Sequence, residues 1–436
     1  MINTHQTCIS WRSASGSALN VPGFSEPHII LQKVGHLSIK LLALLLSLLL
    51  PLISQAQSAP IQPGAYQLER YLPLLENKNV ALVVNHTSLV GETHLVDTLL
   101  ASGIKVTSIF APEHGFRGEA GAGETIQDGT DATTGLPIVS LYGKNQKPTA
   151  EQLEGIDVVV FDIQDVGARF YTYISTMHYV MEACAEQNKP LIILDRPNPN
   201  GYYVDGPVLD TALRSFVGMH PIPIVHGLTV GELAQMINGE GWLTNGAQCA
   251  VQIIPVQNYT HSDRYHLPVR PSPNLPNDQA INLYPSLCLL EGTVMSLGRG
   301  TDLPFQVVGH PVVGHPDTAF SHLADKKFTF TPRSIPGVAA DPKHQGKKCY
   351  GADLRQVPKL DHFSLQYVLD SYREAQKAGI NDKDFFIAFF DKLAGTAQLR
   401  KQIVEGLTEE AIRASWEPML SEYKKMRKGY LLYEDF

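Results

Sequence analysis

Polar side chains capable of acid–base chemistry follow several short apolar runs of this sequence. Pro112-Glu113-His114 comes directly after one run, and Gln164-Asp165 follows another. If these runs are parallel strands, their carboxyl ends share one edge of a sheet, where ligand clefts form. The side chains expected in that cleft are Asn85, Glu113, His114, Arg117, Asp162, Gln164, Asp165, Arg169, Tyr171, Tyr173, Arg196, Asn198 and His226.

Paired carboxylates in such a cleft are typical of glycoside hydrolysis. One carboxylic acid protonates the leaving oxygen, and a second group stabilises or attacks the anomeric carbon. Glu113 is the first choice for the acid, because a proline precedes it and a glycine two residues later leaves room for a substrate. Glu124, Asp162 and Asp165 are the other available carboxylates, and Glu124 and Asp165 are the candidate catalytic partners. The sequence leaves open whether the anomeric configuration is retained or inverted.

Other chemistries are disfavoured or left open by the motifs. The sequence lacks a G-x-G-x-x-G turn after its first apolar run, a P-loop and a G-x-S-x-G elbow, which disfavours nicotinamide enzymes, nucleotide hydrolases and serine hydrolases. A non-catalytic sugar-binding protein stays open. So does a metal-dependent hydrolase with His86, Glu113, His114, Asp162 and His226 as ligands, although their spacing matches no metal motif.

The net charge limits the possible binding partners, and the N-terminal region indicates where the protein is located. The 436 residues carry a net charge of -8 without a long basic run, which argues against nucleic acid. Residues 41–53 form an apolar run too short to span a bilayer, with Lys40 before it and Ser54-Gln55-Ala56 after it. This pattern predicts a signal peptide cleaved after Ala56 and an exported, periplasmic or secreted protein. No cysteine closely follows the run, so no membrane anchor is expected after cleavage.

The order of apolar runs and helical patterns predicts an α/β fold. Runs that are apolar throughout suit parallel strands covered on both faces. The expected strands are Val80–Val84, Val106–Phe110, Ile138–Leu141, Val158–Ile163, Leu191–Leu194, Ile222–Val225 and Val251–Val256. Beyond Tyr259 the chain becomes rich in proline and glycine and then helical, which predicts a second, smaller α+β domain. We expect a leader over residues 1–56, a catalytic domain over 57–275 and a C-terminal domain over 276–436 that contributes to the cleft.

Several motifs resemble the DUF1343 family of exo-β-N-acetylmuramidases, and together they cover nearly all of the chain after the leader. The motifs are Pro112–Gly118, Ala122–Glu124, Leu136–Gly143, Phe161–Tyr173, Asp195–Pro199, His226–Glu232 and Gly298–Thr301. The resemblance implies a Rossmann-like, mostly parallel sheet and release of N-acetylmuramic acid from the non-reducing ends of peptidoglycan fragments. It also implies that Glu113 and Glu124 are the acidic residues of the cleft.

The implied substrate suggests roles for further residues. N-acetylmuramic acid carries a lactyl carboxylate, for which Arg169, Arg196 and Arg299 are candidate clamps. Tyr171 and Tyr173 can pack against the sugar ring. The expected partners are muropeptides or disaccharides derived from peptidoglycan, with no cofactor and no metal. The oligomeric state and the pairing of Cys184, Cys249, Cys288 and Cys349 stay open.

Overall fold

A seven-stranded sheet forms the N-terminal half of the structure, in the order β5-β6-β4-β1-β7-β8-β9. Neighbouring strands are parallel, except that β5 at the edge is antiparallel to β6. The strands are β1 (Asn79–Val84), β4 (Lys105–Ala111), β5 (Gly129–Thr130), β6 (Pro137–Ser140), β7 (Val158–Asp162), β8 (Leu191–Leu194) and β9 (Val251–Ile254). The computed structural model describes residues 59–117, 127–313 and 327–436. The mostly parallel sheet expected from the sequence is confirmed.

Strand β1 shows how the sequence divides the core into two layers. Val80, Leu82 and Val84 pack into one apolar cluster, whereas Ala81 and Val83 pack into the other. Successive side chains of a strand point to opposite faces, so a strand that is apolar throughout must be covered on both sides.

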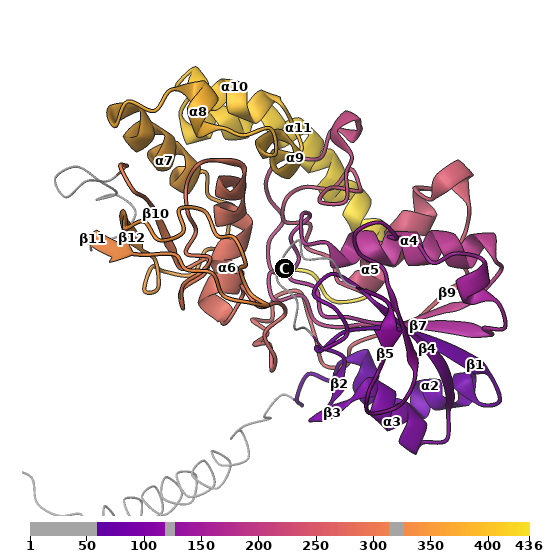
Figure 1. The fold of residues 1–436 in the computed structure, drawn as a ribbon. Coiled ribbons are helices and arrows are strands. Elements are labelled where there is room, and N and C mark those ends of the chain that lie inside the picture. The colour runs from indigo at the N-terminus through magenta and orange to yellow at the C-terminus, as the bar shows by residue number, and fades with distance from the viewer. Residues whose placement is uncertain (1–58, 118–126, 314–326) are drawn as a thin grey trace, which may run out of the picture. The chain divides into compact units, whose positions relative to one another are not determined.

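Helices cover the two faces of the sheet (Figure 1). The helices are α2 (Leu68–Leu75) and α3 (Leu95–Ala101) on one face, and α4 (Tyr173–Glu186) and α5 (Val230–Gly239) on the other. A short hairpin of β2 (Leu89–Val90) and β3 (Thr93–His94) precedes α3. Helix α5 begins with the expected capping box, in which Thr229 and Glu232 each accept a hydrogen bond from the other's backbone amide.

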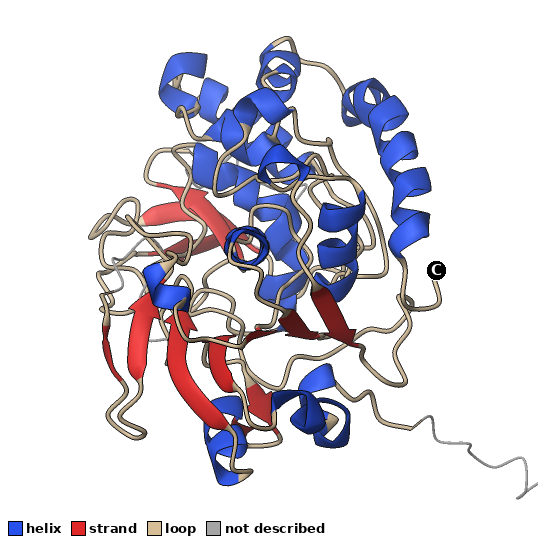
Figure 2. Cartoon of the chain, turned by 90° about the vertical axis from the view of Figure 1, so that its right-hand side faces the viewer, coloured by secondary structure: helices blue, strands red, loops and turns tan. Residues whose placement is uncertain are grey.

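The C-terminal half combines helices with a small antiparallel sheet in the order β10-β12-β11. Its elements are α6 (Asp278–Leu287), the 3-10 helix η6 (Cys288–Gly292), β10 (Val307–His310), β11 (Lys327–Phe330), β12 (Cys349–Asp353), α7 (Gln366–Lys377), α8 (Asp382–Phe385), α9 (Phe390–Ala394), α10 (Gln398–Val404) and α11 (Glu409–Arg427). In Figure 2 the long helix nearest the C-terminus is α11. Tyr423 at its end donates a hydrogen bond to the carbonyl of His226 at 2.7 Å, so the end of the chain returns to the first half. The smaller α+β part is confirmed.

The run Ile222–Val225 is not a strand of the sheet, so this prediction was wrong. Strand β8 pairs directly with β9, which leaves no place for another strand between them. Val225 instead exchanges backbone hydrogen bonds with Asp205 at 2.9 and 3.0 Å, and the carbonyl of Ile224 accepts one from the amide of Arg169. The run is buried as expected, but its apolar composition reflects burial in a connecting segment.

Pro60–Phe436 forms one compact unit by its internal contacts, and the boundary expected near residue 275 stays a prediction. Cys184, Cys249, Cys288 and Cys349 are all buried free thiols. None of the helices in the described ranges has the length and apolar character needed to cross a membrane. The expected signal peptide lies outside the described residues.

The buried guanidinium of Arg169 joins segments that are far apart in sequence. Its Nη1 donates hydrogen bonds to the carbonyls of Pro207 (2.7 Å) and Ile222 (2.8 Å). Its Nη2 donates to the carbonyls of Leu393 (3.0 Å) and Ala394 (2.8 Å) at the end of α9. Burial lowers the pKa of Arg169 to about 9, so the guanidinium remains charged at neutral pH.

Arg169→Met should lower the free energy of unfolding by about 3 kcal/mol or more, because it leaves four buried carbonyls without their donor. Urea unfolding followed by circular dichroism measures this loss. Lys392→Met, at an exposed position of the same helix α9, should change the stability by less than about 0.5 kcal/mol. Equal stability of Arg169→Met and the unmodified protein would contradict the structural role of Arg169.

Candidate active site

A cavity of about 840 Å³ lies beside the loop that follows β4 and is lined by residues of both halves of the chain. From the first half come Glu113, His114, Tyr142, Tyr171, Thr172, Tyr173 and Ser272; from the second come Tyr284, Glu291, Arg299, Phe305 and Lys343, among others. Small-molecule sites typically occupy about 300–1,000 Å³, so an amino sugar and part of its leaving group fit this volume.

Glu113 is held at the cavity wall by a tight turn and by two hydroxyl groups. His114 and Gly115 both have left-handed backbone conformations, with φ of 72° and 76°. The Thr172 hydroxyl donates a hydrogen bond of 2.6 Å to Glu113 Oε2, and the Tyr142 hydroxyl is a second hydrogen-bond partner of the carboxylate. Burial and the Glu113 carboxylate raise the pKa of Tyr142, so the phenol keeps its proton and serves as a donor.

Aromatic rings continue along the cavity from Tyr173 to Phe305. The ring centroids are 4.8 Å apart for Tyr173 and Tyr171, 5.8 Å for Tyr171 and Tyr284, and 5.0 Å for Tyr284 and Phe305. The hydroxyls of Tyr171 and Tyr173 donate to the carbonyl of Pro271, at 2.9 and 3.2 Å. Burial raises the pKa of all three tyrosines, so this aromatic row is uncharged and suited to the faces of a sugar.

A group of charged side chains occupies the cavity near Phe305. Arg299 Nε donates to Glu291 Oε1 at 2.9 Å, and the guanidinium lies 5.0 Å from the centroid of Phe305. Lys343 Nζ donates to the carbonyls of Leu290, Glu291 and Thr293 at 3.3, 2.8 and 2.6 Å. Burial alone would raise the pKa of Glu291, but Arg299 and Lys343 lower it overall, which favours the carboxylate.

Five of the predicted site residues therefore lie together at the cavity: Glu113, His114, Tyr171, Tyr173 and Arg299. Sequence reasoning missed Tyr142, Thr172, Glu291 and Lys343. Tyr142 and Thr172 lie inside motifs that carry the family resemblance, and that signal could have found them. Lys343 stands in a stretch without any such motif, and only the fold brings it to the cavity.

Arg169 and Arg196 do not line the cavity, so the geometry does not support their expected role as clamps for the lactyl carboxylate. The two terminal nitrogens of Arg169 bind the four carbonyls described above. Arg196 binds Asp162 through Nε to Oδ1 at 2.5 Å and Nη2 to Oδ2 at 2.8 Å, and both residues are buried. The carboxylate of Asp162 is fully covered, so its expected contact with substrate gains no support from the geometry either. Arg196 and Asp162 join the ends of β8 and β7, whereas Arg169 joins connecting segments to α9.

Four other predicted substrate contacts instead support loop backbones, and they also lie outside the cavity lining. Asn85 accepts hydrogen bonds from the amide and hydroxyl of Thr87. Gln164 donates to two carbonyls, one of them of Pro197 at 2.8 Å, and Asn198 donates to the carbonyl of Leu228 at 2.9 Å. His226 is buried, which lowers its pKa to about 3 and keeps the ring neutral.

Three further predicted site residues are Arg117 and the two candidate catalytic partners of Glu113, Glu124 and Asp165. Arg117 forms a 2.9 Å ion pair with Asp131 and does not line the cavity. Glu124 lies outside the described residues. Asp165 is buried away from the cavity lining, where its Oδ1 accepts a 2.7 Å hydrogen bond from the amide of Gly167. Its expected catalytic role therefore has no support from the geometry.

The metal alternative gains no support from the described ranges. Within residues 59–117, 127–313 and 327–436, three or more His, Cys, Asp or Glu side chains do not converge as metal ligands. His86 faces the carbonyl of Arg270 at 2.9 Å, and burial lowers its pKa to about 4.

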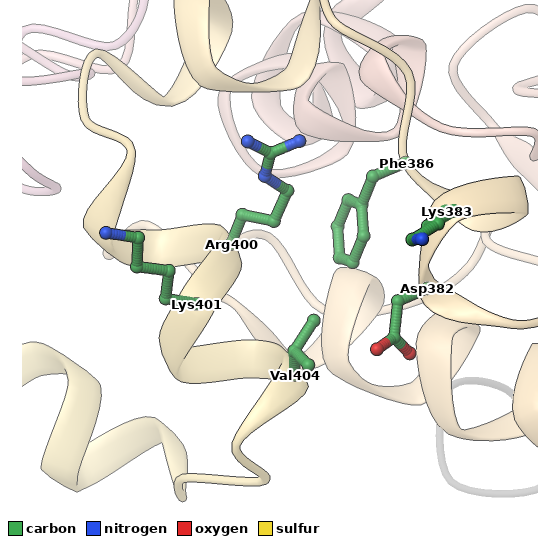
Figure 3. A pocket seen from close by; sticks show the side chains of 6 residues that line it. All are labelled: Asp382, Lys383, Phe386, Arg400, Lys401 and Val404. Carbon is green, nitrogen blue, oxygen red and sulfur yellow. The ribbon is translucent and has the colours of Figure 1, made fainter.

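A second hollow, of about 370 Å³, lies between α8 and α10 (Figure 3). Its lining residues are Asp382, Lys383, Phe386, Arg400, Lys401 and Val404. Arg400 pairs with Asp391 at 2.7 Å, and Asp382 accepts a hydrogen bond from the Tyr372 hydroxyl. Figure 3 shows Lys401 directed away from Phe386. Since its lining holds a single carboxylate that is already bonded, this hollow lacks the paired groups of an acid–base site.

The chain is thus a two-part α/β protein with a cavity lined by both parts. The family model described as "Exo-beta-N-acetylmuramidase NamZ, N-terminal" matches residues 80–279, and its C-terminal counterpart matches residues 282–433. The chain belongs to this exo-β-N-acetylmuramidase NamZ family.

Individual relatives agree with the family models. The peptidoglycan β-N-acetylmuramidase NamZ of Bacillus subtilis (strain 168) is 39% identical over 395 residues, which cover 87% of this chain and 92% of the relative. A crystal structure of a DUF1343 family protein from Bacteroides fragilis NCTC 9343 has a TM-score of 0.77 and 46% identity, covering 87% of this chain and 100% of that chain. A second DUF1343 structure from this strain has a TM-score of 0.74 and 30% identity, covering 86% and 99%.

Burial of Asp165 predicts a specific dependence of stability on pH. Burial raises the pKa of Asp165 to about 7 in the folded protein, against about 3.9 for an exposed aspartate. Between these values the folded state retains a proton that the unfolded state releases. The contribution of Asp165 to stability should therefore be greatest at low pH and should decrease as the pH rises from about 4 to about 7.

Asp165→Asn removes this titration. Relative to the unmodified protein, the variant should gain stability as the pH rises, by up to about 1.4 kcal/mol per pH unit within that window. Urea unfolding at pH 5 and pH 8 measures the difference. Glu154→Gln, at an exposed position, is the control and should show no such trend. A stability difference between Asp165→Asn and the unmodified protein that stays constant with pH would refute the assignment.

Proposed function

We propose that this protein is an exo-acting β-N-acetylmuramidase that releases N-acetylmuramic acid from the non-reducing ends of peptidoglycan fragments. The observation that carries the proposal is the position of Glu113, whose carboxylate is held by Thr172 at the wall of a cavity large enough for an amino sugar. The family and its Bacillus subtilis relative, which are muramidases by name, support the same activity. They favour an enzyme over the non-catalytic sugar-binding protein.

Glu113 is the proposed general acid. Its proton passes to the glycosidic oxygen as the bond from that oxygen to the anomeric carbon breaks, and water supplies the hydroxyl of the released sugar. The donors from Thr172 and Tyr142 fix the direction of the carboxyl group. The aromatic row from Tyr173 to Phe305 covers the sugar without adding charge.

The second catalytic group is proposed to be Glu124, which the family resemblance implies. Of the carboxylates at the described cavity wall, Glu291 is paired with Arg299, and Asp341 is exposed. Neither has the environment of a nucleophile or base aimed at a buried reaction centre.

Hydrolysis of a chromogenic β-N-acetylmuraminide by the purified protein tests the activity, with the corresponding glucosaminide for comparison. Glu113→Gln should lower kcat by about 100-fold or more, because the amide preserves the shape but cannot donate the proton. It should still bind the muraminide. Glu154→Gln, which is exposed and remote from the cavity lining, should retain full activity. Binding without turnover by the unmodified protein would instead support the sugar-binding alternative.

We further propose that the protein is exported and acts in the periplasm or outside the cell. The apolar run at residues 41–53 and the small residues Ser54 and Ala56 support this location, as does a substrate that belongs to the cell wall. Mass spectrometry of the exported protein should show an N-terminus at Gln57. Leu45→Arg, which places a charge in the apolar run, should block export. Retention of residues 1–56 on the exported protein would argue against cleavage there.

A further inference from the structure

The charged group at one end of the cavity contains more cationic than anionic side chains. Arg299 and Lys343 together carry two positive charges, and Glu291 supplies one negative charge between them. The exposed Asp341 also lines the cavity, but water screens its charge. The remaining lining carboxylate, Glu113, is bonded to the Thr172 hydroxyl, and its charge acts on both Tyr173 and Tyr284. Within the group of Arg299, Lys343 and Glu291, one positive charge is therefore left over beside Phe305.

The two cations differ in what they can offer a ligand. Lys343 Nζ donates to three backbone carbonyls, so its hydrogens are already used. Arg299 uses Nε for Glu291 and is held over Phe305, and within the described part of the chain its two Nη atoms have no acceptor. Arg299 is thus a guanidinium fixed on one edge, with its terminal nitrogens available for a second carboxylate.

The positive charge that Glu291 does not balance is unfavourable unless an anion binds beside it. Burial lowers the pKa of Lys343, Glu291 opposes this shift, and Arg299 adds to it. In the described residues Lys343 has no carboxylate of its own as a hydrogen-bond partner. A bound anion would compensate this charge, whereas a neutral ligand would leave it uncompensated.

We propose that Arg299 and Lys343 form an anion subsite that makes the cavity select a sugar bearing a carboxylate. Lys343 is the specificity-determining residue of this subsite. Arg299 contacts the carboxylate. Lys343 supplies the excess charge and, through the carbonyls of Leu290, Glu291 and Thr293, positions Glu291 against Arg299.

This inference rests on the proposed muramidase function, because it assigns the lactyl carboxylate of N-acetylmuramic acid to this subsite. The lactyl group and the glycosidic oxygen are attached at different carbons of the sugar ring. With the ring lying along the aromatic row, the glycosidic oxygen can reach Glu113 while the carboxylate reaches Arg299.

The test uses two substrates that differ only in the charge of the lactyl group: a chromogenic β-N-acetylmuraminide and its lactamide, in which an uncharged amide replaces the carboxylate. The unmodified protein should have a kcat/KM for the acid about 10- to 100-fold higher than for the amide. Lys343→Met should abolish most of this preference by raising the KM for the acid, with little change for the amide. Lys343→Arg should retain much of it, and Arg299→Gln should lose it.

Lys347→Met is the matched control, since Lys347 lies in the same segment but is exposed and away from the cavity lining. It should preserve the preference for the acid. A parallel loss of activity on both substrates in Lys343→Met would show a purely structural lysine and overturn the proposal. Equal hydrolysis of the acid and the amide by the unmodified protein would also overturn it. Hydrolysis of neither substrate by the unmodified protein would instead reject the muramidase function itself.

Discussion

The buried guanidinium of Arg169 is the constraint on which the cavity depends. The residues that follow it, Phe170 to Tyr173, form one wall of the cavity and carry Thr172, the hydrogen-bond donor to Glu113. The carbonyls that it binds on α9 belong to a segment whose Leu393 lines the same cavity. Its two terminal nitrogens bind four carbonyls, although Nε has no hydrogen-bond partner among the described residues, so Nη1 and Nη2 hold the two segments in one arrangement. The wall on the sheet side and the wall on the helical side are therefore set by a single side chain.

Polar residues at the strand ends fall into two groups with different purposes. One group faces inward: Asp162 binds Arg196, and Asp195 accepts hydrogen bonds from Thr229 at 2.7 Å and from Tyr433 at 2.5 Å. The second group, which includes Glu113 and Tyr171, lines the cavity. Loops that converge at the edge of a parallel sheet bring many backbone polar groups out of water, and these need partners. Many of the polar side chains at the strand ends therefore hold the loops in place, and these loops present the few reactive groups.

The sequence predicted those features of the fold that depend on local pattern. Strands such as β1 are apolar throughout and of suitable length, and Thr229 with Glu232 marks the start of α5. The run Ile222–Val225 has the same composition as a strand, but it is a buried connection, because composition reports burial and does not report pairing partners. Arg169 and Arg299 are both arginines inside motifs that carry the family resemblance, and only the fold shows that one binds carbonyls while the other faces the cavity. Glu291 and Lys343 could not be predicted for the same reason.

Recognising an anion and donating a proton place opposite demands on the charge of one cavity. A cation close to a general acid favours its ionised form, which cannot donate a proton. The structure gives the two demands to different side chains, with Arg299 over Phe305 and Glu113 bonded to the hydroxyls of Thr172 and Tyr142. The rings that line the same cavity stay neutral, since burial raises the pKa of Tyr171 and Tyr284. Glu291 further reduces the field of Arg299 by pairing with it. Binding the carboxylate of the substrate then offsets the positive charge that Glu291 leaves uncompensated on Arg299 and Lys343.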